Sequence, residues 1–205
     1  MSNPWETISL SDYENHMKLK TVQQLQAMNS IMSDQFCRYQ ISTLMILGVA
    51  GGNGLNHVDI SNIKRVYGVD INGEYLKACV RRYPKLEDVF IPILCDLQSD
   101  SVKLPVADMV IANLLIEYIG YRNFQKAIQQ VQPQFVSCVI QINTGRSFVS
   151  SSPYLKAFDR LQEIHRDIDK SGVVHALNKI GYNLIYQQNT ELPNQKSLLR
   201  LDFSQ

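Results

Sequence analysis

The sequence has 205 residues, of which 45% are hydrophobic and 19% charged, and its formal net charge is +1. This length suits one α/β domain over residues 1–205, and the near-neutral charge argues against a strong, non-specific nucleic-acid binder. The four cysteines lack C-x-x-C spacing and nearby histidines, which favours free thiols over a metal site. The first residues do not resemble a secretory leader, and no apolar run reaches membrane-spanning length. We therefore expect a cytoplasmic protein with no membrane partner.

Two helices are predicted in the N-terminal segment. The first covers Ser9–Lys20, where Ser11 and the glutamate three residues later form the capping-box pattern of a helix start. The second covers Thr21–Arg38 and carries an apolar stripe, so it has one face to bury. Because both precede the first core strand, we interpret residues 1–40 as a helical cap on an α/β core that spans residues 41–205.

The most informative stretch follows this cap. Leu44–Leu47 is a short apolar run, as expected of a strand buried on both faces of a parallel sheet. It stops at the glycine-rich turn Gly48–Gly54, where the missing Cβ atoms let a ligand approach the backbone closely. A second strand, Arg65–Val69, is followed by Asp70, and an acid in this place can bind two ribose hydroxyls. The pattern predicts a nucleoside-binding βαβ unit, but Ala50 breaks the dinucleotide fingerprint G-x-G-x-x-G.

Helices and strands alternate along the rest of the chain. The expected helices cover residues 53–63, 74–83, 121–131, 154–169 and 171–180. The expected strands cover residues 89–94, 109–112, 135–142, 182–188 and 196–203, the last two joined by a tight turn. With the two strands above, the sequence predicts seven strands in one domain, while spacing leaves their order open.

Four motifs occur in the order seen in one enzyme family. They are the glycine turn Gly48–Gly54, Val69–Asn72, Cys95–Leu97 and Ala107–Asn113. Over Thr43–Asn143 the chain resembles the class I, Rossmann-like S-adenosylmethionine (SAM) methyltransferases. The resemblance implies a doubly wound, seven-stranded sheet that is mostly parallel with an antiparallel last strand. It also implies SAM as cofactor. The family often has an acid two residues before the first glycine, to hold the methionine ammonium, and here that position is Ile46.

The resemblance also implies the cofactor-binding residues. Asp70 would hold the ribose hydroxyls, Asp96 the adenine amino group, and the Leu97 backbone N–H the adenine ring. A turn aspartate without a ligand is the alternative for both acids. The glycine turn would place backbone N–H groups near the methionine carboxylate. The full predicted set is Gly48, Val49, Ala50, Gly51, Asn53, Gly54, Asp70, Ile71, Asn72, Asp96, Leu97, Asn113 and Leu114.

Candidates for an acceptor pocket come from two segments. Tyr13, His16 and Met17 share one face of the first helix, which in the family often lies over the cofactor; covering a sheet edge is the alternative. Glu117 and Tyr118 follow the fourth-strand motif and could line either the methionine site or the acceptor pocket; both could equally be helix-start and core residues. His57, His165 and His175 are interpreted as packing or surface residues. No catalytic triad or metal cluster emerges, so no catalytic base is assigned.

The sequence therefore predicts a SAM-dependent methyltransferase that acts on a small molecule, as a monomer or homodimer. Asn113 is followed by Leu-Leu-Ile-Glu-Tyr rather than Pro-Pro-Tyr/Phe, which weakens an adenine or glutamine amide as acceptor. One alternative is a SAM- or nucleoside-binding protein without transfer activity. A less favoured alternative is an NAD-dependent oxidoreductase, whose glycine spacing and Tyr-x-x-x-Lys motif are missing.

Overall fold

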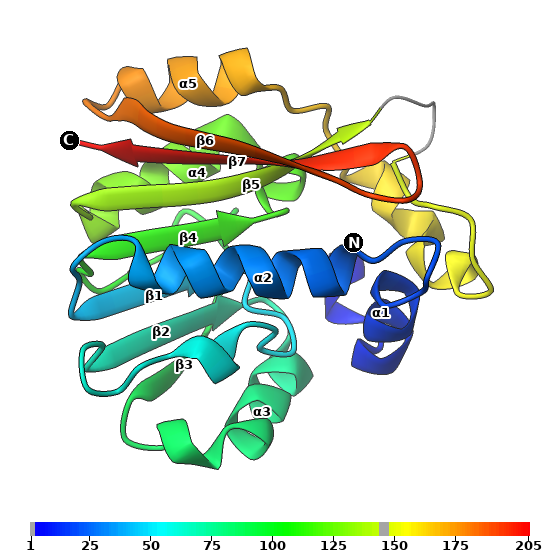
Figure 1. The fold of residues 1–205 in the computed structure, drawn as a ribbon, viewed down its shortest axis with the longest axis horizontal. Helices are drawn as coiled ribbons and strands as arrows, with labels where there is room; N and C mark the ends of the chain where they lie inside the picture. The colour runs from blue at the N-terminus through cyan, green and yellow to red at the C-terminus, as the bar shows by residue number, and fades with distance from the viewer. Residues whose placement is uncertain (1–2, 144–147) are drawn as a thin grey trace.

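The computed structural model describes residues 3–143 and 148–205 (Figure 1). Its α-helices are α1 (Leu10–Met17), α2 (Gln24–Cys37), α3 (Gly73–Arg82), α4 (Ile116–Val131) and α5 (Lys170–Asn178). Its strands are β1 (Thr43–Leu47), β2 (Arg65–Asp70), β3 (Phe90–Leu94), β4 (Met109–Asn113), β5 (Phe135–Asn143), β6 (Asn183–Glu191) and β7 (Lys196–Ser204). Four 3-10 segments join them: η1 (Pro4–Glu6), η2 (Leu55–His57), η3 (Pro84–Leu86) and η4 (Leu155–Glu163).

One sheet contains all seven of these strands, in the order β3-β2-β1-β4-β5-β7-β6. β1 pairs in parallel with β2 and β4, while β3 and β5 extend the parallel part on either side. β7 runs antiparallel to both β5 and β6. The predicted doubly wound sheet with an antiparallel last strand is confirmed. Because the order reverses between β1 and β4, a crevice opens at the carboxyl ends of these two strands, where α/β sheets bind ligands.

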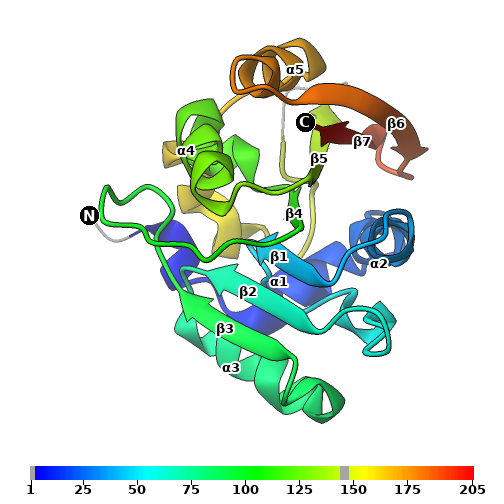
Figure 2. The ribbon, with the colours of Figure 1, turned by 90° about the vertical axis from the view of Figure 1, so that its left-hand side faces the viewer.

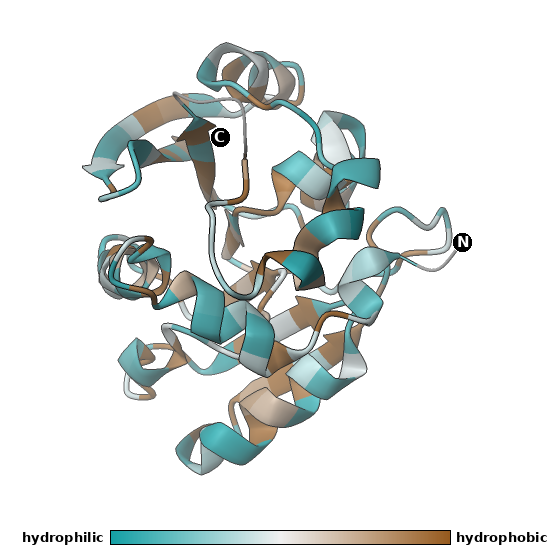
Figure 3. Cartoon of the chain, turned by 90° about the vertical axis from the view of Figure 1, so that its right-hand side faces the viewer, coloured by the Kyte–Doolittle hydropathy of each residue, from teal (hydrophilic) through white to brown (hydrophobic). Residues whose placement is uncertain are grey.

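The sheet is covered on both faces (Figure 2). Met45 and Leu47 pack in one buried cluster with residues of α4 and α5, and Leu44 and Ile46 pack in another with α2 and α3. This alternation follows from the two-residue period of a strand, and it explains why the β1 sequence is apolar throughout. Figure 3 shows the hydrophobic strands between helices of mixed hydropathy. η1 and α1 lie apart from this sandwich, next to the site described below.

The helix predicted over residues 53–63 is not formed, and the structure has only the short turn η2 there. α2 packs against this segment. Gly54 has φ +91°, and a Cβ on it would lie 2.7 Å from the Sδ atom of Met32 in α2. A φ of +91° lies outside the helical region, and Leu55 and Ile63 are already buried in the cluster that contains Met32, so the segment buries its apolar residues without forming a helix.

Several predicted boundaries differ from the structure. Ser9 rather than Ser11 caps α1, because the Ser9 Oγ accepts the Asp12 backbone N–H at 3.1 Å. α4 begins five residues earlier than predicted, with a kink at Gly120 (φ +74°). The segment predicted as a helix over residues 154–169 is the 3-10 segment η4. Its three-residue period aligns side chains three positions apart on one face, which suits a short apolar contact.

A buried polar network crosses the sheet beneath α2. Arg200 and Asp202, both on β7 and fully buried, form two hydrogen bonds of 2.8 and 2.6 Å. A third bond, 2.6 Å long, joins Arg200 to Asp34 of α2. From Asp202 the network continues through Ser137 of β5 to Gln35 of α2. It ends at Asn113, at the carboxyl end of β4, so the network ties α2 to the strand end that borders the crevice.

We expect Asp202→Ala to lower the free energy of unfolding by about 3–5 kcal/mol, because it leaves the buried Arg200 guanidinium with an incomplete set of partners. Urea unfolding measures the loss. The matched control is Asp100→Ala, which removes a 94% exposed partner of Lys126 and should change stability by less than about 1 kcal/mol. Equal losses in the two variants would contradict a structural role for the network.

Candidate functional site

The site begins at the glycine-rich turn that follows β1. Gly48 (φ +71°), Ala50 (φ +47°) and Gly52 (φ +81°) alternate with residues of negative φ. Positive φ costs a glycine little, which explains two of these positions, whereas Ala50 adopts it with a Cβ. Cβ atoms on Gly52 or Gly51 would lie within 3 Å of neighbouring side chains. The turn is therefore a compact backbone cradle at the end of the central strand.

A first cleft, of about 690 Å³, lies beside this turn. Asp70 lies in its wall, with one carboxylate oxygen 2.8 Å from the Ala50 backbone N and the other 2.9 Å from the Asn72 backbone N. Burial raises the pKa of Asp70, and these backbone hydrogen bonds oppose the rise. The lining residues are Asn3, Trp5, Tyr13, Gly48, Ala50, Asp70, Ile71, Tyr75, Cys95, Asp96, Leu97, Gln98, Asn113, Leu114, Leu115, Tyr118 and Ile119.

A second cleft, of about 560 Å³, lies between the turn, α1 and α2. Glu14 of α1 lines it and forms an ion pair with Arg82 of α3, which also donates to the Gly51 carbonyl. The two side chains thus hold α1 against the glycine turn. The lining residues are Tyr13, Glu14, Met17, Gln24, Leu25, Met28, Met32, Ile46, Gly48, Val49, Ala50, Gly51, Asn53, Asn113 and Leu114.

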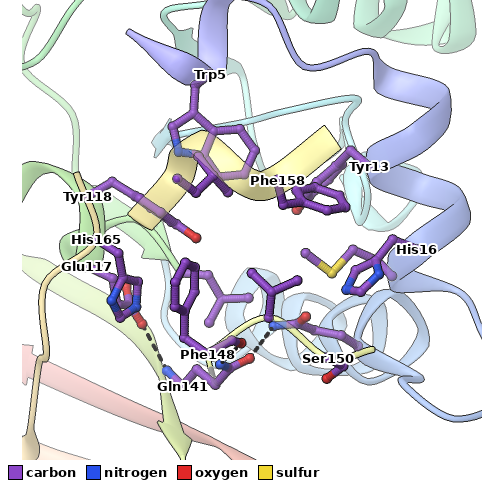
Figure 4. Close-up of a pocket in the computed structure, with 15 residues that line it drawn as sticks. Trp5, Tyr13, His16, Glu117, Tyr118, Gln141, Phe148, Ser150, Phe158 and His165 are labelled. Carbon is purple, nitrogen blue, oxygen red and sulfur yellow. Dashed lines mark hydrogen bonds between the residues drawn. The ribbon is translucent and has the colours of Figure 1, made fainter. Parts of the chain in front are cut away.

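A third cleft, of about 570 Å³, is lined by fifteen residues, five of which are phenylalanine, tyrosine or tryptophan (Figure 4). Glu117 is buried in its wall: one carboxylate oxygen accepts the Gln141 backbone N–H at 2.9 Å, and the other has no partner among the described residues. Burial raises the pKa of Glu117 to about 7. The lining residues are Trp5, Tyr13, His16, Met17, Gln24, Leu114, Glu117, Tyr118, Gln141, Phe148, Val149, Ser150, Phe158, Leu161 and His165.

Two residues, Tyr13 and Leu114, line all three clefts. Leu114 follows the last residue of β4 and has φ +55°, an uncommon value for a residue with a Cβ. Burial raises the pKa of Tyr13 to about 12, so its hydroxyl is protonated at neutral pH. The three clefts therefore meet at one place, between α1 and the carboxyl end of β4.

The structure places most of the predicted site residues on these clefts. The five acceptor-pocket candidates, Tyr13, His16, Met17, Glu117 and Tyr118, all line the third cleft. Eleven of the thirteen cofactor candidates line the first or second cleft, and the exceptions are Gly54 and Asn72.

The exceptions have structural roles in this molecule. Gly54 packs under Met32, and the Asn72 side chain caps α3 while donating to the Trp5 carbonyl at 2.9 Å.

Asn113 does line both clefts, but its side-chain amide exchanges two hydrogen bonds with Gln35, so both of its polar atoms already have protein partners.

Other lining residues were not anticipated from the sequence. His165, predicted to be a packing or surface residue, lines the third cleft and stacks on Phe148 with ring centroids 3.8 Å apart. Trp5 of η1 and Gln141 of β5 also line it, although they lie far apart in the sequence. A lone tryptophan in the predicted cap was the one available signal, whereas nothing in the local sequence around Gln141 marks a site.

Within residues 3–143 and 148–205, no three His, Cys, Asp or Glu side chains are grouped so as to hold a metal ion. None of the helices in the same ranges is both long and apolar enough to cross a membrane.

Comparison with solved structures identifies the fold. Magnesium protoporphyrin IX methyltransferase from Synechocystis PCC 6803, with bound S-adenosylhomocysteine (SAH), has a TM-score of 0.66 at 9% identity, covering 98% of this chain and 96% of that chain. The N-methyltransferase NodS from Bradyrhizobium japonicum, in complex with SAH, has a TM-score of 0.65 at 10% identity, covering 99% and 98%. The chain therefore has the Rossmann-like fold of the class I SAM-dependent methyltransferases.

The same fold also occurs in an enzyme named for a different reaction. The cyclase SpnF has a TM-score of 0.66 at 9% identity, covering 90% of this chain and 82% of that chain. No protein-family model matches the chain, and no curated protein has a detectably similar sequence. The reaction must therefore be argued from the clefts, since one fold can support several chemistries.

The buried carboxyl of Glu117 gives a prediction for stability. Its folded-state pKa, about 7, exceeds the ordinary value of 4.5, so the native state ionises less readily than the unfolded state. Stability from this group is therefore lost as pH rises from about 4.5 to about 7. Glu117→Gln removes the titration, and its unfolding free energy relative to the parent should rise by about 2–3 kcal/mol between pH 5 and pH 8.

Thermal and urea unfolding at both pH values test this, with Glu163→Gln as control. Glu163 is a half-exposed carboxylate on η4, so its variant should keep the same difference from the parent at both pH values. A Glu117→Gln difference that does not change with pH would show that the carboxyl titrates normally.

Proposed function

We propose that the protein is a SAM-dependent methyltransferase that acts on a small-molecule acceptor in the cytoplasm. The observation that carries the proposal is the meeting of the three clefts at Tyr13 and Leu114. Two clefts flank the glycine turn, as the two halves of a nucleoside–amino acid cofactor require. The third opens from the same place, so an acceptor in it would lie next to the centre of the cofactor.

In this proposal the adenosine occupies the first cleft. Asp70 accepts hydrogen bonds from the ribose hydroxyls, since each of its oxygens has a remaining lone pair beside the backbone bond it already accepts. Asp96 and Leu97 follow β3 at the same cleft and would contact the adenine. Asp70, the single buried acid of this lining, fits a nucleoside better than a ligand with a phosphate group beside the ribose, because the carboxylate would repel the phosphate.

The methionine part occupies the second cleft, next to Gly48 and Ala50, which both clefts share. Ile46 lines this cleft where the resembled family often has an acid. Glu14 is the only carboxylate among the described residues of the lining, and it lies over Gly51. We assign the methionine ammonium to Glu14, which can accept it on lone pairs not used by Arg82.

The bound cofactor would supply an electrophilic methyl group, and the chain's own residues would orient the acceptor and exclude water. Holding two reacting groups in line can lower the activation barrier by about 7–11 kcal/mol. η1 and α1 place Trp5 and Tyr13 at the meeting point, where their rings pack at 5.8 Å between centroids. These rings would shield the transfer from solvent.

Calorimetric titration tests the cofactor assignment. SAM and SAH should bind, and NADP should bind more weakly because Asp70 would repel its 2′-phosphate. Asp70→Ala should weaken SAH binding by about 1.5–3 kcal/mol, the scale of hydrogen bonds to a charged group. Asp59→Ala is the control, since Asp59 organises a turn outside the three clefts. Tighter binding of NADP than of SAM would favour the oxidoreductase, and SAM binding without turnover would favour the binding protein.

Glu14→Gln should weaken SAH about tenfold and leave 5′-methylthioadenosine, which lacks the amino acid part, unchanged. The ratio of the two affinities, measured by calorimetry, is the decisive quantity. If the substitution only loosened α1, it would weaken the binding of both ligands, because Tyr13 of the same helix lines the first cleft. Glu74→Gln, which removes another carboxylate in a surface ion pair, is the control. Equal affinity of Glu14→Gln and the parent for SAH would refute the assignment.

A further inference from the structure

The third cleft has aromatic walls set at steep angles to one another. Trp5 packs against Tyr13 with an interplanar angle of 79°, and against Tyr118 with ring centroids 5.0 Å apart and an angle of 84°. Phe148 and Phe158 line the cleft from other segments, and Figure 4 shows the side chains surrounding a common space. Rings that surround a space from several sides can offer it the negative faces of their quadrupoles, which attract cations.

The charge of the lining points the same way. Glu117 is an acid with one oxygen that has no partner among the described residues, and it is 5% exposed. The described lining residues include no lysine and no arginine. Burial lowers the pKa of His16 and of His165, which favours the neutral form of both rings, and the nearby Lys196 ammonium acts in the same direction. Lys196 lies outside the lining and donates to the Phe148 carbonyl, and burial lowers its own pKa to about 8. A buried carboxylate without a counter-ion is costly, so a ligand that supplies a positive charge would relieve that cost.

The polar floor of the cleft is already paired within the protein. The Gln24 amide donates to the Gln141 side-chain oxygen at 3.2 Å, and the Gln141 side-chain nitrogen donates to Asn143 at 2.6 Å and to the Phe148 carbonyl at 2.8 Å. His16 shares a 2.7 Å hydrogen bond with Ser152. These groups hold the walls in place, so the free Glu117 oxygen is the polar atom that most needs a ligand donor.

We propose that the third cleft binds an organic ammonium ion, held by the aromatic rings of Trp5, Tyr13 and Tyr118 and by the Glu117 carboxylate. The inference rests on the proposed function in naming this ligand the methyl acceptor, which makes the acceptor an amine. A primary or secondary ammonium must lose one N–H proton before its nitrogen has a lone pair to react. The proton moves to the free Glu117 oxygen, which becomes a neutral carboxyl, and later passes to solvent. The nitrogen lone pair would form the new N–CH3 bond while the S–CH3 bond of the methyl donor breaks, with its electron pair remaining on sulfur.

Trp5 is the single tryptophan of the chain, so its fluorescence reports on this cleft. The test titrates choline and its neutral isostere 3,3-dimethylbutan-1-ol, which have the same shape and differ in charge. Because Trp5 also lines the first cleft, each titration is run both with saturating SAH and without it. We expect choline to bind at least tenfold more tightly than the isostere, and we expect Glu117→Gln to abolish that preference.

Glu117→Gln retains an oxygen that can accept the Gln141 backbone N–H, and circular dichroism checks that the variant is folded. Two further variants complete the test. Tyr118→Leu removes part of the aromatic wall and should also lose the preference for choline. Glu163→Gln should keep it. Equal binding of choline and the isostere, or a preference that survives both Glu117→Gln and Tyr118→Leu, overturns the inference. SAH calorimetry separates this outcome from failure of the proposed function: SAH binding with no cation preference overturns only the inference, and a cation preference without SAH binding overturns only the methyltransferase.

Discussion

The parallel pairing of β1 with β2 on one side and with β4 on the other is the constraint on which the site depends. It brings the ends of three strands to one edge, so that Gly48, Asp70 and Asn113 border the same cleft although they lie far apart in the chain. The first two clefts follow from this arrangement of strands. The third needs more, because its walls also come from η1, α1, β5 and η4.

The polar network under α2 shows how the crevice is held open at a fixed shape. Arg200 and Asp202 are fully buried, and such pairs add little net stability compared with apolar residues. In this structure the pair helps to fix the position of α2 and of the end of β4, since the network leads through Ser137 and Gln35 to Asn113. The amide of Asn113 thereby acts as a fixed part of the wall.

Glu117 combines a cost for folding with the role that we propose for it in the site. Its ionised form is disfavoured by burial, and one of its oxygens has no partner in the described part of the chain. Placing it on the first turn of α4, directly after β4, puts a carboxylate beside the meeting point of the clefts. A site that keeps such a group trades stability for chemistry, which is a common feature of functional sites.

The sequence by itself determined the features that arise within a few residues. The apolar run of β1, the glycine turn and Asp70 after β2 each follow from local backbone and burial preferences, and together they predicted a nucleoside-binding βαβ unit. The doubly wound sheet and the residues of the cofactor site were predicted from the resemblance of four such local motifs to the methyltransferases. Only the tertiary structure decided the rest. Residues 53–63 stay non-helical where Gly54 takes φ +91° against Met32 of α2 and where Leu55 and Ile63 are buried in the same cluster as that helix. Trp5, Gln141 and His165 meet in one cleft because η1, the carboxyl end of β5 and the segment at the end of η4 lie around the same space, and no local pattern encodes such contacts.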